Sequence, residues 1–138
     1  MKRNLIGTLS LVALSLLLNV TGAAAQSVVK GNVPFAFTVA KQQMPAGSYS
    51  ILSNSAASIQ IRNNDTGAAV LSLVRSELPG DRSPRLVFHY VGNQYFLSQV
   101  WGSEGSAGMT VPASSLEKEL RIATNRTGRV GEIVIALK

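Results

Sequence analysis

The sequence predicts an all-β domain: an antiparallel sandwich or small barrel of about seven strands, with one short helix near the C-terminus. Short segments alternate apolar and polar residues with a period of two, which is the periodicity of a strand that buries one face. Turn-forming Gly, Pro, Asn and Asp separate these segments at short intervals. Residues 112–123 abandon the alternation and predict the helix.

The first 25 residues have the three parts of a secretory signal peptide. Lys2 and Arg3 are positively charged, residues 5–18 form an apolar run, and residues 23–25 are the small residues of a cleavage site. An uncleaved membrane anchor is the alternative, but the run is shorter than the roughly 20 residues that a spanning helix needs. Cleavage after residue 25 would leave residues 26–138 as a single β-rich domain, exported to the periplasm or the cell exterior.

The composition excludes several kinds of chemistry. The chain has no cysteine, which excludes a disulfide framework, a thiolate metal site and a cysteine nucleophile. It has 13 basic and 7 acidic residues, and loss of Lys2 and Arg3 with the signal peptide would leave 11 against 7, a net charge of +4. This mild excess does not indicate a nucleic-acid partner. No second apolar segment approaches membrane-spanning length, so we expect no transmembrane segment after cleavage.

Four segments predict strands in the first half of the mature chain. Residues 33–40 and 58–62 alternate clearly, and residues 45–51 pass through a Pro-Ala-Gly turn before re-entering the core. Residues 69–74 (AVLSLV) are apolar on both faces, which is typical of a strand in the interior of a sheet. The side chains expected to face the core are those of Phe35, Phe37, Val39, Tyr49, Ile51, Ile59 and Ile61.

Residues 85–101 (RLVFHYVGNQYFLSQVW) predict a hairpin with a two-residue turn at Gly92-Asn93, where glycine accepts a positive φ at the first turn position. We expect the more apolar face of this hairpin to lie in the core, and we expect Trp101 to continue that face. A slip of one residue would exchange the two faces. Counted outward from the turn, the core face pairs Tyr90–Tyr95, Phe88–Leu97 and Leu86–Gln99, and the other face pairs His89–Phe96 and Val87–Ser98.

The predicted helix begins after a capping box, with Ser114 as N-cap and Glu117 three residues later. Leu116 and Leu120 stand four residues apart, so we expect them to pack on one face. Residues 102–109 form a connector before this helix. After it, a turn at residues 124–128 leads to a final strand through Ile133 and Ile135.

The segment Asp65-Thr66-Gly67-Ala68 matches the active-site motif of retroviral-type aspartic peptidases. Such an enzyme needs two carboxylates about 3 Å apart, so a chain with one such motif would have to form a two-fold dimer. The polar residues Arg62-Asn63-Asn64 precede the motif where the peptidase has a buried strand. We therefore favour a turn between two strands and keep the homodimeric peptidase, with Asp65 as its catalytic residue, as the alternative.

His89 is the only histidine, so a Ser-His-carboxylate triad would have to include it. Ser98 could supply the hydroxyl, with Asp81 or Glu104 as the carboxylate, but no nucleophile motif supports this and a half-buried strand histidine is favoured. The carboxylates are scattered, so we expect no metal site and no cofactor.

Two groups are candidate binding residues. Tyr90, Tyr95 and Trp101 could stack on a sugar, although core packing is the favoured role for hairpin aromatics. Arg121, Arg126 and Arg129, with Lys118, form a basic cluster that is more often a solvated face than an anion site.

The motifs VPFAFTV, MPAGSYSI, LVFHYVGNQYFLSQVW and VPASSLEKEL are spread along the mature chain. On these motifs it resembles a group of small exported proteins of soil bacteria. The resemblance implies export and a β fold, and it points to His89 and Trp101, which recur in that group. It implies no particular reaction.

The function expected from the sequence is that of an exported, non-enzymatic β domain. It would act by binding or assembly at the cell envelope, with a glycan, a lipid or another envelope protein as partner. An exposed sheet edge would allow strand addition.

Overall fold

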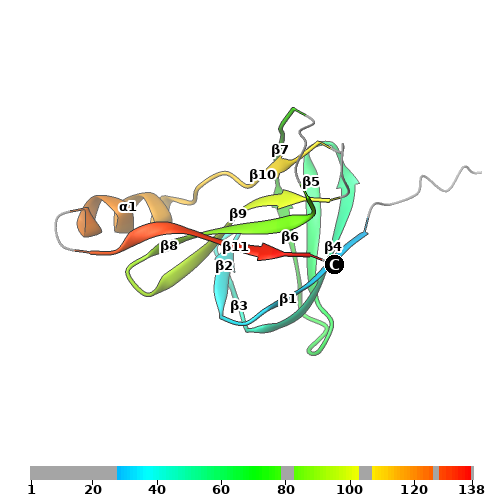
Figure 1. Cartoon of the computed structure of the whole chain (residues 1–138), viewed down its shortest axis with the longest axis horizontal. Coiled ribbons are helices and arrows are strands. Elements are labelled where there is room, and N and C mark those ends of the chain that lie inside the picture. Colours follow the sequence, from blue (N-terminus) through cyan, green and yellow to red (C-terminus); the bar gives the residue numbers. More distant parts are fainter. Residues whose placement is uncertain (1–27, 79–82, 103–106, 126–127, 138) are drawn as a thin grey trace, which may run out of the picture.

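The computed structural model describes residues 28–78, 83–102, 107–125 and 128–137. They form two β-sheets and one helix, and the strands of the two sheets run in clearly different directions (Figure 1). Residues 1–25, which are predicted to form the signal peptide, lie outside these described ranges. The elements are β1 (Val28–Val33), β2 (Phe37–Val39), β3 (Gln42–Met44), β4 (Gly47–Ser55), β5 (Ser58–Asn63), β6 (Ala69–Leu73), β7 (Arg75–Ser76), β8 (Arg85–Val91), β9 (Gln94–Trp101), β10 (Met109–Thr110), α1 (Ser115–Thr124) and β11 (Val130–Ala136).

The predicted all-β class is confirmed, and the architecture is that of a sandwich. Sheet A has the order β1-β4-β5-β6, and sheet B has the order β11-β8-β9-β10-β7, with β2 beside β9 and β3 beside β2. The described residues form eleven strands, more than the seven or so that were expected: seven have five or more residues, including the unpredicted β1, and four have only two or three. The short strands escape prediction because alternation needs about four residues to show.

The core lies between the two sheets and consists of side chains that the alternation predicts. Of the core side chains expected in the first half of the mature chain, all but Phe35 are at most 3% exposed. The expected continuous strand over residues 33–40 is wrong, because β1 ends at Val33 and β2 begins at Phe37. Phe35 lies in the bend between them, half-buried against Phe88 and Tyr95.

The β8–β9 hairpin has the predicted register only near its turn. Gly92 has a φ of +65°, and the pairs from Val91–Gln94 to Phe88–Leu97 are as expected. A bulge then shifts the register by one residue, so that Leu86 faces Val100 and Arg85 faces Trp101. Val100 is therefore in the core between the sheets, whereas Trp101 is buried on the other face of sheet B. The prediction that Trp101 continues the core face is wrong, because an extra residue in one strand is invisible to a period-two pattern.

β6 is the strand whose predicted place is most clearly wrong. Residues 69–74 were expected in the interior of a sheet, but among the described strands β6 is the last of sheet A and pairs only with β5. Val70 and Ser72 point inward, while Leu71 and Leu73 are 60% and 71% exposed. The sequence of an interior strand therefore occupies an edge.

Two strands of sheet B, β2 and β10, pair with different parts of β9. β2 lies against β9 at the pair Thr38–Phe96, and β10 lies against it further along, at Gln99 and Val100. The chain leaves β10 through residues 111–114 and enters α1, which lies at the left of Figure 1 and contacts β8. Within the described ranges, no helix is long and apolar enough to cross a membrane.

Candidate functional site

His89 is the centre of a polar network on the face of sheet B that α1 covers. Its Nδ1 atom lies 2.8 Å from Oε1 of Glu117, a residue that is only 3% exposed. On the other side of the ring, Nε2 lies 3.1 Å from Oγ of Ser98 and 3.4 Å from Oε1 of Glu132. An ionised carboxylate can only accept, so with Glu117 ionised it is His89 Nδ1 that donates in this pair.

These contacts have the order of a Ser-His-carboxylate triad, with Glu117 in the place that the sequence analysis gave to Asp81 or Glu104. Asp81 and Glu104 lie outside the described residues. A nucleophile has to reach its substrate, however, and Ser98 is 5% exposed within β9. The network is better suited to fixing α1, because Glu117 is the only buried residue of the helix and His89 holds it to β8.

Of the basic cluster, the structure describes Lys118, Arg121 and Arg129. Arg121 turns back to Glu117, with its Nη2 atom 3.6 Å from the carboxylate. Arg129 is exposed, and its backbone carbonyl accepts a hydrogen bond from the N–H of Gly92. Arg126 lies outside the described residues. The helix is capped as predicted, since Ser114 Oγ accepts from the N–H of Glu117, but Leu116 is 45% exposed and does not pack as expected.

The three candidate aromatic residues do not form one platform. Tyr90 and Tyr95 face each other near the hairpin turn, and Tyr90 lies over Gly131 of β11, where a Cβ atom would come within 2.5 Å of its hydroxyl. Tyr95 stacks on Phe35 with ring centroids 4.2 Å apart. Trp101 is at the other end of the hairpin, 5% exposed, and donates to Gln99.

Asp65 lies in the turn between β5 and β6, as the favoured interpretation of its motif predicts. Its Oδ2 atom accepts the N–H of Ser48 at 3.0 Å. The preceding Asn63 is fully buried, and its Oδ1 atom accepts the N–H groups of Asp65 and Thr66 at 2.8 and 2.9 Å. The Asp-Thr-Gly segment is thus held by side chain–backbone bonds of a kind common in turns.

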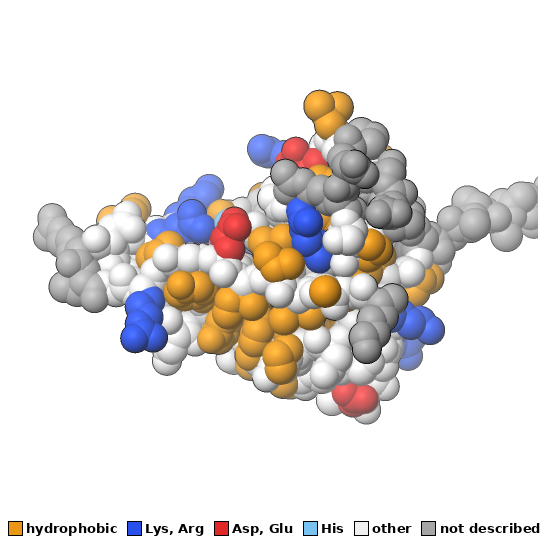
Figure 2. All heavy atoms as spheres, viewed as in Figure 1, with side chains coloured by type: hydrophobic (Ala, Val, Ile, Leu, Met, Phe, Trp, Pro, Cys, Tyr) orange, Lys and Arg blue, Asp and Glu red, His pale blue; other side chains and the backbone are white. Residues whose placement is uncertain are grey.

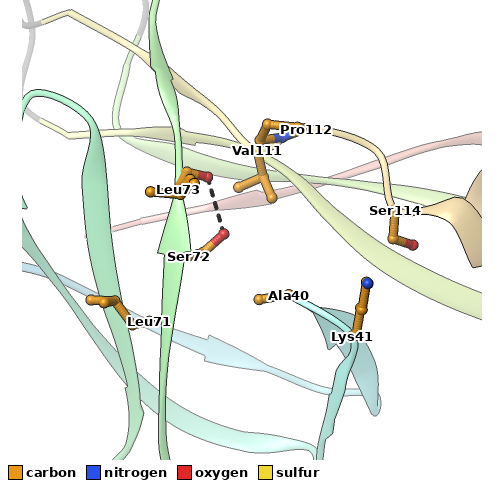
Figure 3. A pocket seen from close by; sticks show the side chains of 8 residues that line it. All are labelled: Ala40, Lys41, Leu71, Ser72, Leu73, Val111, Pro112 and Ser114. Carbon is orange, nitrogen blue, oxygen red and sulfur yellow. Dashed lines mark hydrogen bonds between the residues drawn. The ribbon is translucent and has the colours of Figure 1, made fainter.

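A concave site lies along β6. A groove of about 390 Å³ separates its free edge from the β2–β3 turn and from the segment before α1. In Figure 3, Ser72, Ala40 and Lys41 point toward the space between these walls, whereas Leu71 and Leu73 point away from it. We call this the β6 groove; its lining residues are Ala40, Lys41, Leu71, Ser72, Leu73, Val111, Pro112 and Ser114.

The hydrogen bonds to β5 show which backbone groups of β6 face the groove. Asn63 N–H bonds to Ala68 C=O, and Val74 N–H bonds to Ala57 C=O. In a regular antiparallel pair such bonds recur at every second residue, so Val70 and Ser72 also bond to β5. The N–H and C=O groups of residues 69, 71 and 73 therefore point to the free edge, where Leu73 C=O accepts only the Ser72 hydroxyl, at 3.1 Å.

The opposite wall of the β6 groove is conformationally strained. Ala40 and Lys41, which form the β2–β3 turn, have φ values of +48° and +66°. Residues other than glycine avoid this region at a cost of roughly 1–2 kcal/mol each. Such strain is often found at binding sites, where it fixes a particular geometry.

Sequence reasoning missed both the partner of His89 and the β6 groove. Glu117 is 28 positions from His89, and its place in the capping motif gave it another role. The groove depends on which strand ends the sheet, which alternation does not specify. The available signal was that residues 69–74 are apolar on both faces. On the sequence alone, this pattern was interpreted as a strand in the interior of a sheet.

Comparison with known proteins identifies no relative of this chain. No family model matches it, and neither the curated proteins nor the solved structures include a significant match.

Proposed function

We propose that this protein is an exported, non-enzymatic β domain that binds an extended segment of another envelope protein as an additional strand beside β6. The single observation that carries the proposal is the free edge of β6: an apolar strand with outward-facing backbone groups and a groove beside it. Export rests on the signal-peptide pattern of residues 1–25.

The composition of β6 supports a protein partner. Edge strands of soluble proteins usually carry charges, prolines or bulges that prevent pairing with another chain. Residues 69–74 contain none of these charges or prolines, and their pairing with β5 is regular. Leu71 and Leu73 add two largely exposed leucines on the outer face, beside the polar Gln60 and Ser58 of β5. An added strand would cover both.

The β6 groove also indicates the chemistry of the added strand. Alternate side chains of the strand would enter the groove, where Val111 and Ala40 favour apolar groups. Lys41 lines the same groove and would complement a carboxylate of the partner. A polypeptide fits better than a lipid chain, because only a polypeptide supplies donors and acceptors for the backbone of Leu71 and Leu73.

Hydrogen exchange tests this proposal directly. The probe is a blocked octapeptide that alternates Val and Thr and carries one Asp for Lys41. We expect it to slow exchange of the Leu71 and Leu73 amides, whose N–H groups face the free edge. The Ser72 amide, which already bonds to β5, should keep its rate.

Two substitutions at one position provide the control. Leu71→Pro removes the N–H that faces the partner and leaves the bonds to β5 intact, since proline is tolerated on edge strands. Leu71→Thr removes the same leucine but keeps the N–H. We expect the proline variant to lose peptide binding and the threonine variant to retain it. Equal binding by the proline variant and the wild type would refute strand addition.

A further inference from the structure

A second cavity lies away from the β6 groove, beside the turn of the β8–β9 hairpin. It has a volume of about 220 Å³ and is formed by β2, β3 and the first residues of β9. Drug-sized ligands occupy pockets of roughly 300–1,000 Å³, so this cavity is suited to a smaller group. We call it the amide pocket; its lining residues are Ala36, Phe37, Thr38, Gln43, Asn93, Gln94 and Tyr95.

The fold brings these residues together from two distant parts of the chain. Thr38 of β2 pairs with Gln43 of β3 and lies in parallel pairing with Phe96 of β9. The turn at Gly92 leads directly into Asn93 and Gln94, which therefore lie beside the β2–β3 hairpin. Gln42, the neighbour of Gln43, does not line the pocket.

The lining is polar but uncharged. Gln43, Asn93 and Gln94 contribute three carboxamides, and Thr38 contributes a hydroxyl. Within the described part of the chain, none of these four side chains has a hydrogen-bond partner. Each carboxamide both donates and accepts, which matches ligands whose own groups do both, such as sugar hydroxyls. A charged ligand would meet no opposite charge among these residues.

Tyr95 is one of two aromatic residues in the lining of the pocket, with Phe37. Its ring is half-buried and stacks on Phe35, with an angle of 22° between the two planes, so its position is fixed. An aromatic ring offers apolar area beside the polar groups, and Tyr is well suited to surfaces that are apolar at one end and wet at the other.

Figure 2 shows that hydrophobic side chains gather over the middle of the visible face, around β11.

From this lining we infer that the amide pocket binds a neutral sugar unit of a glycan. The carboxamides would bond its hydroxyl groups, and Tyr95 would contact its C–H surface. The inference is independent of strand addition at β6, because the two sites share no lining residue.

The test uses three neutral oligosaccharides as probes: maltohexaose, cellohexaose and chitohexaose. NMR spectra of isotope-labelled protein report the side-chain amide signals of Gln43, Asn93 and Gln94. We expect at least one probe, at millimolar concentration, to shift these signals. The proposal is overturned if none of the three does so, or if only an acidic oligosaccharide such as an alginate fragment does.

Variants of the pocket glutamines, with Gln42→Ala as a control, test whether the sugar binds in the amide pocket. The double variant Gln43→Ala/Gln94→Ala should weaken binding of the active probe by about tenfold or more, which corresponds to about 1.4 kcal/mol. Gln42→Ala removes an exposed glutamine from the same strand and should leave binding unchanged. If the double variant does not fold, the two single variants replace it. Undiminished binding by the variants that lack Gln43 or Gln94 would place the sugar elsewhere and refute the site.

Discussion

At the scale of single residues, neighbouring positions of the same type have quite different surroundings. Asn63 is fully buried and supports the β5–β6 turn through two backbone N–H groups. Asn64 is exposed, and its side chain bonds to the hydroxyls of Ser48 and Ser50. The Asn63 amide also lies beside Gly47, where a Cβ atom would come within 3.1 Å of its Nδ2 atom and 2.7 Å of the Asp65 carboxylate. The turn that contains Asp65 is therefore packed against the beginning of β4.

Tyr49 gives a prediction about alkaline pH. Burial raises the pKa of its hydroxyl above the ordinary value, and the nearby Asp65 carboxylate adds to the effect. Below about pH 10 the tyrosine is protonated in both the folded and the unfolded chain. Above that pH the unfolded chain releases this proton before the folded protein does, so the contribution of Tyr49 to stability falls as the pH rises.

The variant Tyr49→Phe has no group to ionise at this position. Near neutral pH it should be less stable than the wild type by about 1 kcal/mol, because it lacks the hydrogen bond to the Pro45 carbonyl. Urea unfolding of both proteins from neutral pH to about pH 11 should show this gap narrowing. A constant or widening gap would contradict a raised pKa.

At the scale of elements, the sequence predicted the β8–β9 turn, the helix N-cap and the long strands other than β1, because each has a local signal. The bulge in β9 has none, and it moves Val100 and Trp101 to faces opposite to those expected. The edge position of β6 and the contact between Glu117 and His89 also depend on which distant segments pack together. The sequence therefore identified candidate residues such as His89, but it did not identify the contacts that define their roles.

Helix α1 gives a prediction at this scale, because its apolar residues contribute little to its attachment. Leu116 and Ile122 are 45% and 74% exposed, while Glu117 is buried against His89. Glu117→Ala should lower the free energy of unfolding by about 1–3 kcal/mol, since it leaves buried polar groups without partners. Glu119→Ala, on the exposed side of the same helix, should change it by no more than about 0.5 kcal/mol. Chemical denaturation measures both, and equal effects would show that the Glu117 contact does not hold the helix.

At the scale of the whole molecule, composition and patterning together predicted the fold class, and the two-sheet structure excludes the small barrel that the sequence had left open. The function was less predictable, because both proposed sites are assembled from residues of separate elements, and Lys41 is the only charged residue in either lining. The sequence motif with the strongest catalytic association, around Asp65, instead forms a turn. The homodimeric peptidase stays an alternative proposal that depends on the oligomeric state.

Native mass spectrometry of the processed protein, taken from the cells that produce it, tests both the predicted cleavage and the oligomeric state. We expect a mature protein beginning at Gln26, because the signal-peptide pattern predicts cleavage after Ala25. Retention of residues 1–25 would contradict cleavage. A dimer would keep the peptidase in contention, and Asp65→Asn would then decide: an enzyme would lose all cleavage, whereas a binding domain would be unaffected.

The uncharged edge of β6 also has a consequence when the partner proposed above is scarce. Two copies can pair β6 with β6 in antiparallel fashion without any charge opposing the contact. Newly made chains should therefore be most prone to aggregate when they are abundant and the partner is scarce. Balanced production of the two proteins would protect the cell, and a solubility tag or a charged substitution at Leu73 would serve the same purpose during purification.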